Sequence, residues 1–363
     1  MADSLKDMFD PARYRSLASE LSALSPAFNA TAFLDHTLSG LASRELMDRM
    51  RRTSAGVALA LPLPYREQLD VLRALAPRIG HNFIGIFLSD FVAQHGLSPA
   101  DVPASLDGLR FFTRFGSAEF AIRPFIQRDP PGTLAVLQSW TASDNEHVRR
   151  LASEGSRPRL PWGARLQALV ADPSPTLPIL TALRADPSLY VRKSVANHLN
   201  DISKDHPDVA LALVSTWDLT QPHTAWIVRH ALRTLIKRGH PRALALLGAG
   251  SAPKLDATFT ASPKRIQLGD TVTLTATLAS TARRSQSLLI DYVVHYARAS
   301  GKASEKIFKW TQLDLAPGAT FTLTKRQTIR DFSTRRHHAG RHRIELQING
   351  RRLAETAFTL SVP

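Results

Sequence analysis

Three stretches of the chain align with one another: residues 145–156 read NEHVRRLASEGS, residues 188–199 read SLYVRKSVANHL, and residues 225–236 read AWIVRHALRTLI. Each contains a valine followed by an arginine and then by Arg, Lys or His. The valines, Val148, Val191 and Val228, are 43 and 37 residues apart. Spacings of this size are typical of stacked two-helix repeats of the HEAT and armadillo kind. We therefore expect an α-solenoid in which neighbouring repeats bury one another's apolar faces.

The same helical character extends over residues 1–250. Apolar residues there recur at spacings of three and four, between short breaks of Pro, Gly or Asp. After Gly248 the pattern changes to alternating or β-branched runs such as DTVTLTATL, separated by turn sequences such as LGD and APG. Seven such runs predict a β-sandwich of immunoglobulin type. The predicted fold class is multidomain α plus β: an all-α HEAT-like-repeat solenoid at 1–250 and an Ig-like β-sandwich at 255–363.

The composition favours a polyanionic partner. The chain of 363 residues has 46 Lys and Arg against 31 Asp and Glu, a net charge of +15. Such an excess suits nucleic acid or an acidic membrane surface, although a basic protein without such a partner is the alternative. From residue 255 onward, 17 Lys and Arg face 8 Asp and Glu, and the run RDFSTRRHHAGRHR at 330–343 holds much of the excess.

Several site classes are excluded by composition and pattern. The chain has no cysteine, which excludes disulfides, thiolate zinc sites and cysteine nucleophiles. Its histidines lack partnering acids at ligand spacing, so we expect no metal and no cofactor. The start of the sequence lacks the pattern of a secretory signal, and the apolar stretch at 56–64 is too short to span a bilayer. These features predict a cytoplasmic protein that does not contact membranes.

Glu154 is unusual because it lies at the C-terminal end of a predicted helix. The last turn of a helix exposes carbonyl groups, so a carboxylate there is disfavoured by roughly 0.3–1 kcal/mol. The repeat alignment places Asn197 and Thr234 in the same column. Asp201, one helical turn after Asn197, could bring a second carboxylate to the same groove. The alternatives are structural: Glu154 could pair with Arg150, and Asp201 could cap a helix or pair with Lys204.

Two further residues have both a structural and a functional interpretation. Ser117 could cap a helix with Glu119 in its first turn, where a carboxylate is favoured. Trp162 ends the stretch PRLPW, in which two prolines stiffen the chain. It could serve as an exposed platform or fill the core equally well.

These stretches resemble the AlkC type of alkylation-repair DNA glycosylase, within the HEAT-like-repeat superfamily that also contains AlkD. The resemblance covers most of residues 1–245, and an Ig-like domain follows in a subset of that family. The motifs that carry it are LKDMFD at 5–10, FLSDFVAQHGL at 87–97, SAEFAIRPFI at 117–126, EHVRRLASEGSRPRLPW at 146–162 and DPSLYVRKSVANHLNDISKDHP at 186–207.

The resemblance implies hydrolysis of the N-glycosidic bond of 3-methyladenine and 3-methylcytosine in DNA, without rotation of the base out of the duplex. It implies that Glu119 and Glu154 are the catalytic carboxylates, that Trp162 lies beside the lesion, and that Asp201 belongs to the same site. The predicted DNA-binding residues include the basic column of the repeats and two arginines near the lesion: Arg149, Arg150, Arg192, Lys193, Arg229, Arg157 and Arg159.

The basic run near the C-terminus could enter a DNA groove or clamp the backbone. Its predicted contacts are Arg335, Arg336, His337, His338 and Arg341, and the alternative is a basic loop without a fixed partner. We therefore expect a monomeric, monofunctional DNA glycosylase whose partner is double-stranded DNA with alkylated bases. The alternatives are a non-catalytic HEAT-repeat protein that binds distorted or damaged duplexes and a scaffold for acidic proteins.

Overall fold

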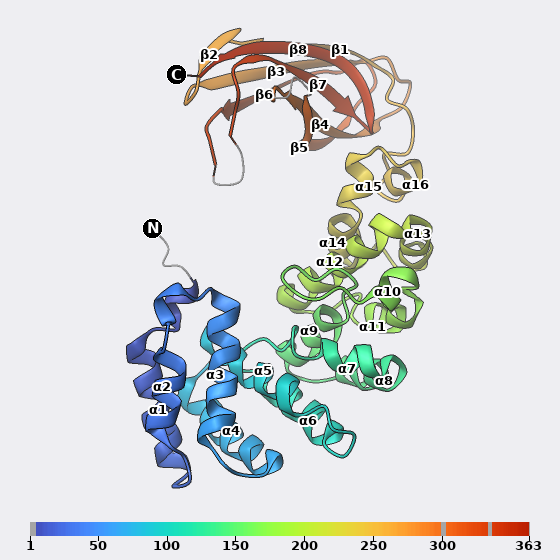
Figure 1. Ribbon diagram of the computed structural model, residues 1–363. Helices are drawn as coiled ribbons and strands as arrows, with labels where there is room; N and C mark the ends of the chain where they lie inside the picture. Colours follow the sequence, from blue (N-terminus) through green and yellow to red (C-terminus); the bar gives the residue numbers. More distant parts are fainter. Residues whose placement is uncertain (1–4, 299–302, 333–335, 363) are drawn as a thin grey trace. The chain divides into compact units, whose positions relative to one another are not determined.

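The computed structural model describes residues 5–298, 303–332 and 336–362. By their internal contacts the residues form two compact units, Met1–Ala231 and Leu232–Pro363. The first unit is helical, and the second combines short helices with β-sheets (Figure 1). This confirms the predicted fold class of a helix-rich region followed by a β domain. The boundary between the units, after Ala231, precedes the change in sequence pattern after Gly248. The predicted domain limits, 1–250 and 255–363, therefore stay a prediction.

The first unit consists of α-helices joined by short turns and 3-10 segments. The α-helices are α1 (Pro11–Leu24), α2 (Ala30–Leu38), α3 (Leu46–Ala60), α4 (Tyr65–Ile79), α5 (Ile86–His95), α6 (Val102–Phe112), α7 (Arg123–Arg128), α8 (Pro130–Trp140), α9 (Glu146–Gly155), α10 (Gln167–Ala171), α11 (Leu177–Ala182), α12 (Leu189–Asp205), α13 (Pro207–Ser215) and α14 (Pro222–Ala231). The 3-10 segments are η1 (Leu5–Met8), η2 (Leu41–Ser43), η3 (Phe83–Gly85) and η4 (Ser174–Thr176).

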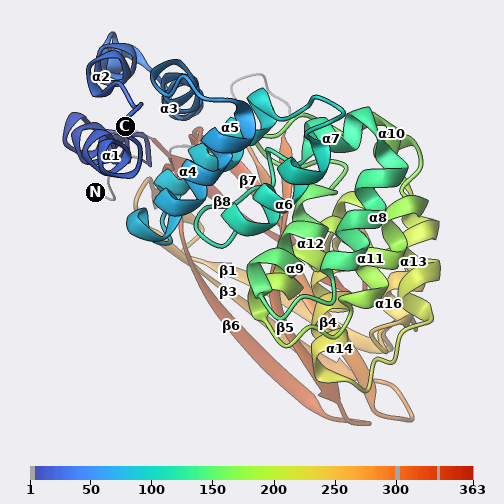
Figure 2. The ribbon, with the colours of Figure 1, turned by 90° about the horizontal axis from the view of Figure 1, so that it is seen from below.

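The aligned stretches correspond to α9, α12 and α14. Helix α12 packs against both α9 and α14, and Figure 2 shows α9 and α12 side by side. The aligned valines, Val148, Val191 and Val228, are all buried. Asn145 and Ser188 cap the first two helices by accepting hydrogen bonds from backbone amides of the first turn. The repeat register is therefore confirmed, since equivalent residues occupy equivalent core positions.

The second unit begins with α15 (Arg233–Lys237) and α16 (Pro241–Ala245). Its strands are β1 (Leu255–Ser262), β2 (Arg265–Gln267), β3 (Thr271–Ser280), β4 (Gln286–Tyr296), β5 (Ser304–Leu315), β6 (Thr320–Thr328), β7 (Gly340–Ile348) and β8 (Arg351–Ser361). They form one sheet of order β1-β3-β6 and one of order β2-β8-β7-β4-β5. The β2–β8 pair is parallel, and the other pairs are antiparallel. All seven predicted runs are strands, and β2 was missed because it has only three residues.

Apolar residues of both sheets form the sandwich core. In β3 every second residue, from Val272 to Leu278, is buried, as expected for a strand with one face on a core. Tyr292 of β4 stacks on Phe308 at 5.1 Å between ring centroids and meets Trp310 edge-on at 5.9 Å. Aromatic packing thus occupies the interior of this cysteine-free sandwich. Within the described residues, no helix has the length and apolar character needed to cross a membrane.

Candidate active site

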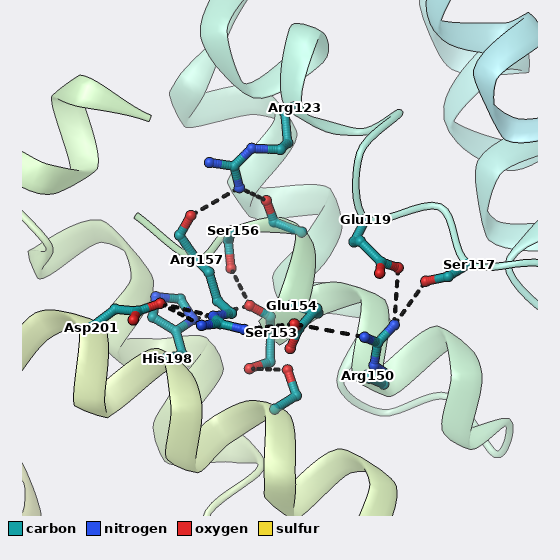
Figure 3. A network of polar contacts seen from close by, with 12 residues as sticks. Ser117, Glu119, Arg123, Arg150, Ser153, Glu154, Ser156, Arg157, His198 and Asp201 are labelled. Atoms are coloured by element: carbon teal, nitrogen blue, oxygen red, sulfur yellow. Dashed lines mark hydrogen bonds and ion pairs between the residues drawn. The ribbon is translucent and has the colours of Figure 1, made fainter. Parts of the chain in front are cut away.

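The predicted acids belong to one network of charged side chains in the first unit (Figure 3). Acids and bases alternate along it, and each member forms an ion pair with the next. In order, the network comprises Glu119, Arg150, Glu154, Arg157, Asp201 and Lys204. The structure therefore brings together the three carboxylates that the sequence singled out.

Arg150 connects Glu119 with Glu154. Its Nη1 donates to Glu119 Oε2 at 3.0 Å and to Ser117 Oγ at 2.7 Å, and its Nη2 lies 3.6 Å from Glu154 Oε1. The predicted helix cap at Ser117 is wrong, because α7 begins only at Arg123. Ser117 and Glu119 lie in the segment before α7 instead, and both side chains contact Arg150 there.

Arg157 connects Glu154 with Asp201. Its Nη1 donates to Glu154 Oε1 at 2.7 Å, and its Nε donates to Asp201 Oδ2 at 2.8 Å. Lys204 donates to the other oxygen of Asp201 at 3.2 Å. The local ion pairs considered from the sequence, Glu154 with Arg150 and Asp201 with Lys204, therefore both occur. They are parts of a larger network whose central contacts join α9 to α12.

Arg123 explains why a carboxylate is tolerated at the end of α9. This arginine is only 1% exposed, and its Nη1 donates to the carbonyl oxygens of Gly155 and Arg157 at 2.9 and 2.8 Å. Ser156 donates to the carbonyl of Ala152. Burial and the nearby Arg157 lower the pKa of Arg123 to about 10, so it stays charged at neutral pH. A cation thus neutralises the negative helix end beside Glu154.

Glu154 is ionised at neutral pH. It is buried, with 7% of its surface exposed, and burial alone would raise its pKa. The guanidinium groups of Arg150 and Arg157 outweigh burial and hold the pKa below its usual value. Glu154 can therefore accept hydrogen bonds and stabilise a cation, but it has no proton to donate.

Sequence reasoning missed three residues in or beside this network. Arg123 could have been noticed as a lone arginine in the apolar run FAIRPF. Tyr190, adjacent to the aligned Val191, lies with its ring 4.7 Å from the Arg150 guanidinium. His198 is fully buried, bonds the carbonyl of Ser153 and has its pKa lowered to about 3 by burial and by Arg157. It is therefore neutral at physiological pH.

Trp162 is an exposed aromatic in an unfavourable backbone conformation. It is 71% exposed, and its φ of 63° lies in the left-handed region that large side chains avoid. The core-filling alternative is therefore wrong. A strained, exposed tryptophan at the end of the tail that begins at Arg157 points to a functional reason for its position.

Most of the arginines predicted to bind DNA, in the basic column and near the lesion, already have partners in the chain. Arg149 forms two hydrogen bonds with Asp186, at 2.7 and 3.1 Å, and Arg192 donates to the backbone carbonyls of Asp186 and Pro187. Arg159 makes a two-pronged pair with Asp205. Their predicted DNA contacts are not tested by these pairs and stay predictions.

The remaining predicted DNA-binding residues differ in exposure. Lys193 is exposed, and its side chain forms no hydrogen bond or ion pair with any other described residue. Arg336 and Arg341 are exposed, whereas His337 is buried and bonds Asp331. His338 is half-buried, and its carbonyl bonds the His342 ring. Arg335 lies outside the described residues, and Arg229 has partners within the chain.

Nothing in the described part of the chain resembles a metal centre. No group of three or more His, Asp or Glu side chains there could hold a metal ion.

Comparisons with known proteins agree with this architecture. Residues 112–235 match the family of DNA alkylation repair enzymes, and residues 256–362 match the C-terminal Ig-like domain of the YhaZ protein. The uncharacterised protein YhaZ of Bacillus subtilis (strain 168) is 42% identical over 352 residues, which are 96% of this chain and 97% of that protein. The Pseudomonas fluorescens alkylpurine DNA glycosylase AlkC, solved bound to DNA containing an abasic-site analogue, is 48% identical with a TM-score of 0.95, covering 99% of this chain and 100% of that chain. The chain therefore belongs to the AlkC family of DNA alkylation repair enzymes.

Proposed function

We propose that the chain is a monofunctional DNA glycosylase that removes cationic N3-methylated bases, 3-methyladenine and 3-methylcytosine, from double-stranded DNA. The observation that carries the proposal is the ionised Glu154, linked through Arg150 to Glu119. The similarity to an alkylpurine DNA glycosylase over the whole chain supports it. We propose that the chain acts as a monomer, without a metal or cofactor.

The chemistry of these lesions suits a site without a general acid. An N3-methylated adenine or cytosine carries a positive charge, so it leaves as a neutral base and needs no proton from the enzyme. The sugar develops oxocarbenium character, which a nearby carboxylate stabilises while it orients the attacking water. Two opposite charges about 4 Å apart at an effective dielectric near 20 attract by about 4 kcal/mol, or roughly a thousandfold in rate if felt in the transition state.

The ion-pair partners and burial of each acid suggest its role. Glu119 and Glu154 face the cation, since they share Arg150 and lie at that end of the network. Asp201 is 2% exposed and acts through Arg157, which it orients against Glu154. Trp162 would lie along the lesion nucleotide as an exposed platform. Because Trp162 is exposed rather than part of an enclosed pocket, we propose that the base leaves without being rotated into a closed pocket.

The test is to incubate the protein with methylated duplex DNA and to identify the released bases chromatographically. Release of 3-methyladenine and 3-methylcytosine is expected, and no release of any base would refute the proposal. Glu119→Gln keeps the side chain's size while removing its charge, and should slow release in proportion to the cation stabilisation that is removed.

A non-catalytic protein that binds damaged duplexes is the second candidate. It is favoured by one observation: each carboxylate of the network already has a cationic partner, as in a purely structural network. Glu154→Gln separates the two candidates. Loss of base release with retained affinity for DNA supports the enzyme, whereas unchanged release removes Glu154 from the mechanism.

A further inference from the structure

A hollow of about 270 Å³ lies at the N-terminal end of α9, in the same unit as the acids. It is lined by residues of α4, of the end of α6 and of the turn between α8 and α9, and α4 and α6 are neighbours in Figure 2. The lining includes Arg73, Arg110, Phe111, Arg114, Ser143 and Asn145. None of these residues was predicted to bind DNA.

The hollow has two positive charges that no acid neutralises. Arg73 is paired with Asp107 at 2.6 Å. Arg110 and Arg114, four residues apart at the end of α6, are both exposed, and neither forms an ion pair within residues 5–298, 303–332 and 336–362. Asp107 is the only acid in the lining and is already used. The hollow therefore favours an anion.

Two of the three arginines around the hollow, Arg73 and Arg114, pack against an aromatic ring. The guanidinium carbons of Arg73 and Arg114 lie 5.8 and 5.7 Å from the ring centre of Phe111, within the range of cation–π attraction. The hydroxyl of Ser143 accepts from the backbone amide of Asn145, so its own proton is free to donate. A ligand here meets hydrogen-bond donors, and a phosphate oxygen is the matching acceptor.

In a second hollow, one lining arginine is already neutralised by an acid. It is lined by Arg149 and Asp186, and these two side chains already form a two-pronged ion pair. An anion there would have to break that pair. The hollow at Arg110 and Arg114 imposes no such cost.

We propose that this hollow binds a backbone phosphodiester of duplex DNA. The inference rests on the proposed function for the identity of the ligand. Asn145 and Glu154 are nine residues apart on one helix, about 13 Å at 1.5 Å per residue. The phosphate therefore belongs to a nucleotide a few positions from the lesion, and it fixes the register of the duplex on the helix that carries Glu154.

The experiment compares Arg110→Gln/Arg114→Gln with the matched control Arg15→Gln/Arg128→Gln in the full chain. The control arginines are exposed on α1 and α7, and no ion pair involves them in the described part of the chain. Binding of a fluorescent unmodified duplex is measured from low to high salt. The test variant should bind about tenfold more weakly, and its log–log salt dependence should be less steep by about 0.9 for each phosphate that it no longer neutralises. The control should keep the wild-type slope.

Base release by the test variant at limiting DNA should fall together with its weaker binding, whereas the control variant should release bases at the wild-type rate. Equal slopes for the test variant and wild type would overturn the proposal. So would binding of inorganic phosphate that depends on these arginines while duplex affinity does not, because a free anion would then be the ligand. If the wild-type chain releases bases but its salt slope equals that of the test variant, this phosphate site alone is refuted. If the wild-type chain neither binds DNA nor releases bases, the proposed function is refuted.

Discussion

Arg157→Leu should destabilise the first unit by about 3 kcal/mol, because it leaves two buried carboxylates without their shared guanidinium. Glu154 is 7% and Asp201 2% exposed, and Arg157 reaches them at 2.7 and 2.8 Å. Arg150 remains 3.6 Å from Glu154, and Lys204 remains 3.2 Å from Asp201. Each acid thus keeps one partner, which places the cost at the lower end of the range for a broken buried pair.

A matched control lies two residues away. Arg159 makes a two-pronged contact with a single acid, Asp205, at 2.7 and 2.9 Å, and these side chains are 28% and 29% exposed. Water already screens that pair, so Arg159→Leu should hardly change the unfolding midpoint. Both variants remove one positive charge and one arginine. They differ in the burial of the partner acids and in their number, two for Arg157 and one for Arg159.

Urea unfolding followed by the far-ultraviolet helical signal is the assay, because most helices belong to the first unit. A large decrease in stability for Arg157→Leu and a small one for Arg159→Leu is expected. Equal decreases in the two variants would refute the reasoning, since burial would then not decide the cost. Arg157→Lys should recover part of the stability, because a lysine can reach one acid but not both.

Three other changes test neighbouring claims. Base release should show no titration step from Glu154 between about pH 5 and pH 8, because the pKa of Glu154 is depressed. The stability that its ion pairs contribute is present above the unfolded-state pKa and is lost as the pH falls through the folded-state pKa. An acid titration of the helical signal measures this loss. Trp162→Gly should cost no stability, because relief of about 1 kcal/mol of left-handed backbone strain offsets the extra conformational entropy that a glycine loses on folding. The same variant should slow base release about tenfold, and full activity would remove the platform role of Trp162. Burial raises the pKa of Asp291 to about 6, so its contribution to stability is lost as pH rises through that value. Asp291→Asn should therefore stabilise the second unit by about 3 kcal/mol at pH 8 and by little at pH 4 in urea unfolding, and equal gains at both pH values would contradict this.

The repeat and the strands could be predicted because they depend on local periodicity. A buried valine must recur wherever one repeat packs on the next, so Val148, Val191 and Val228 identified α9, α12 and α14 as equivalent. Alternation identified the strands for the same reason. The helix cap proposed at Ser117 failed because a tertiary contact with Arg150, 33 residues away, decides the conformation of that segment.

The site was only partly predictable, because two of the five ion pairs in its network span long stretches of sequence. Spacing could suggest the pair of Glu154 with Arg150, four residues apart, but not that of Arg157 with Asp201, which are 44 residues apart. The same limit applies to the basic column. Arg149 looks unpaired in the sequence, yet its partner Asp186 lies 37 residues further on. Resemblance supplied the identity of the acids, and the structure supplied their partners.

The division of charge between the network and the rest of the chain has a physical consequence. The network contains three carboxylates and three cations, so its field largely cancels at a distance, whereas the chain as a whole has a net charge of +15. Long-range attraction to a polyanion must therefore come from cations outside the network, and salt screens it over about 8 Å. Under the proposed function, a preference for a cationic lesion would arise only in contact with Glu119 or Glu154, where the nearest charge dominates. The proposed function thus assigns affinity and discrimination to different side chains, and only affinity should depend strongly on salt.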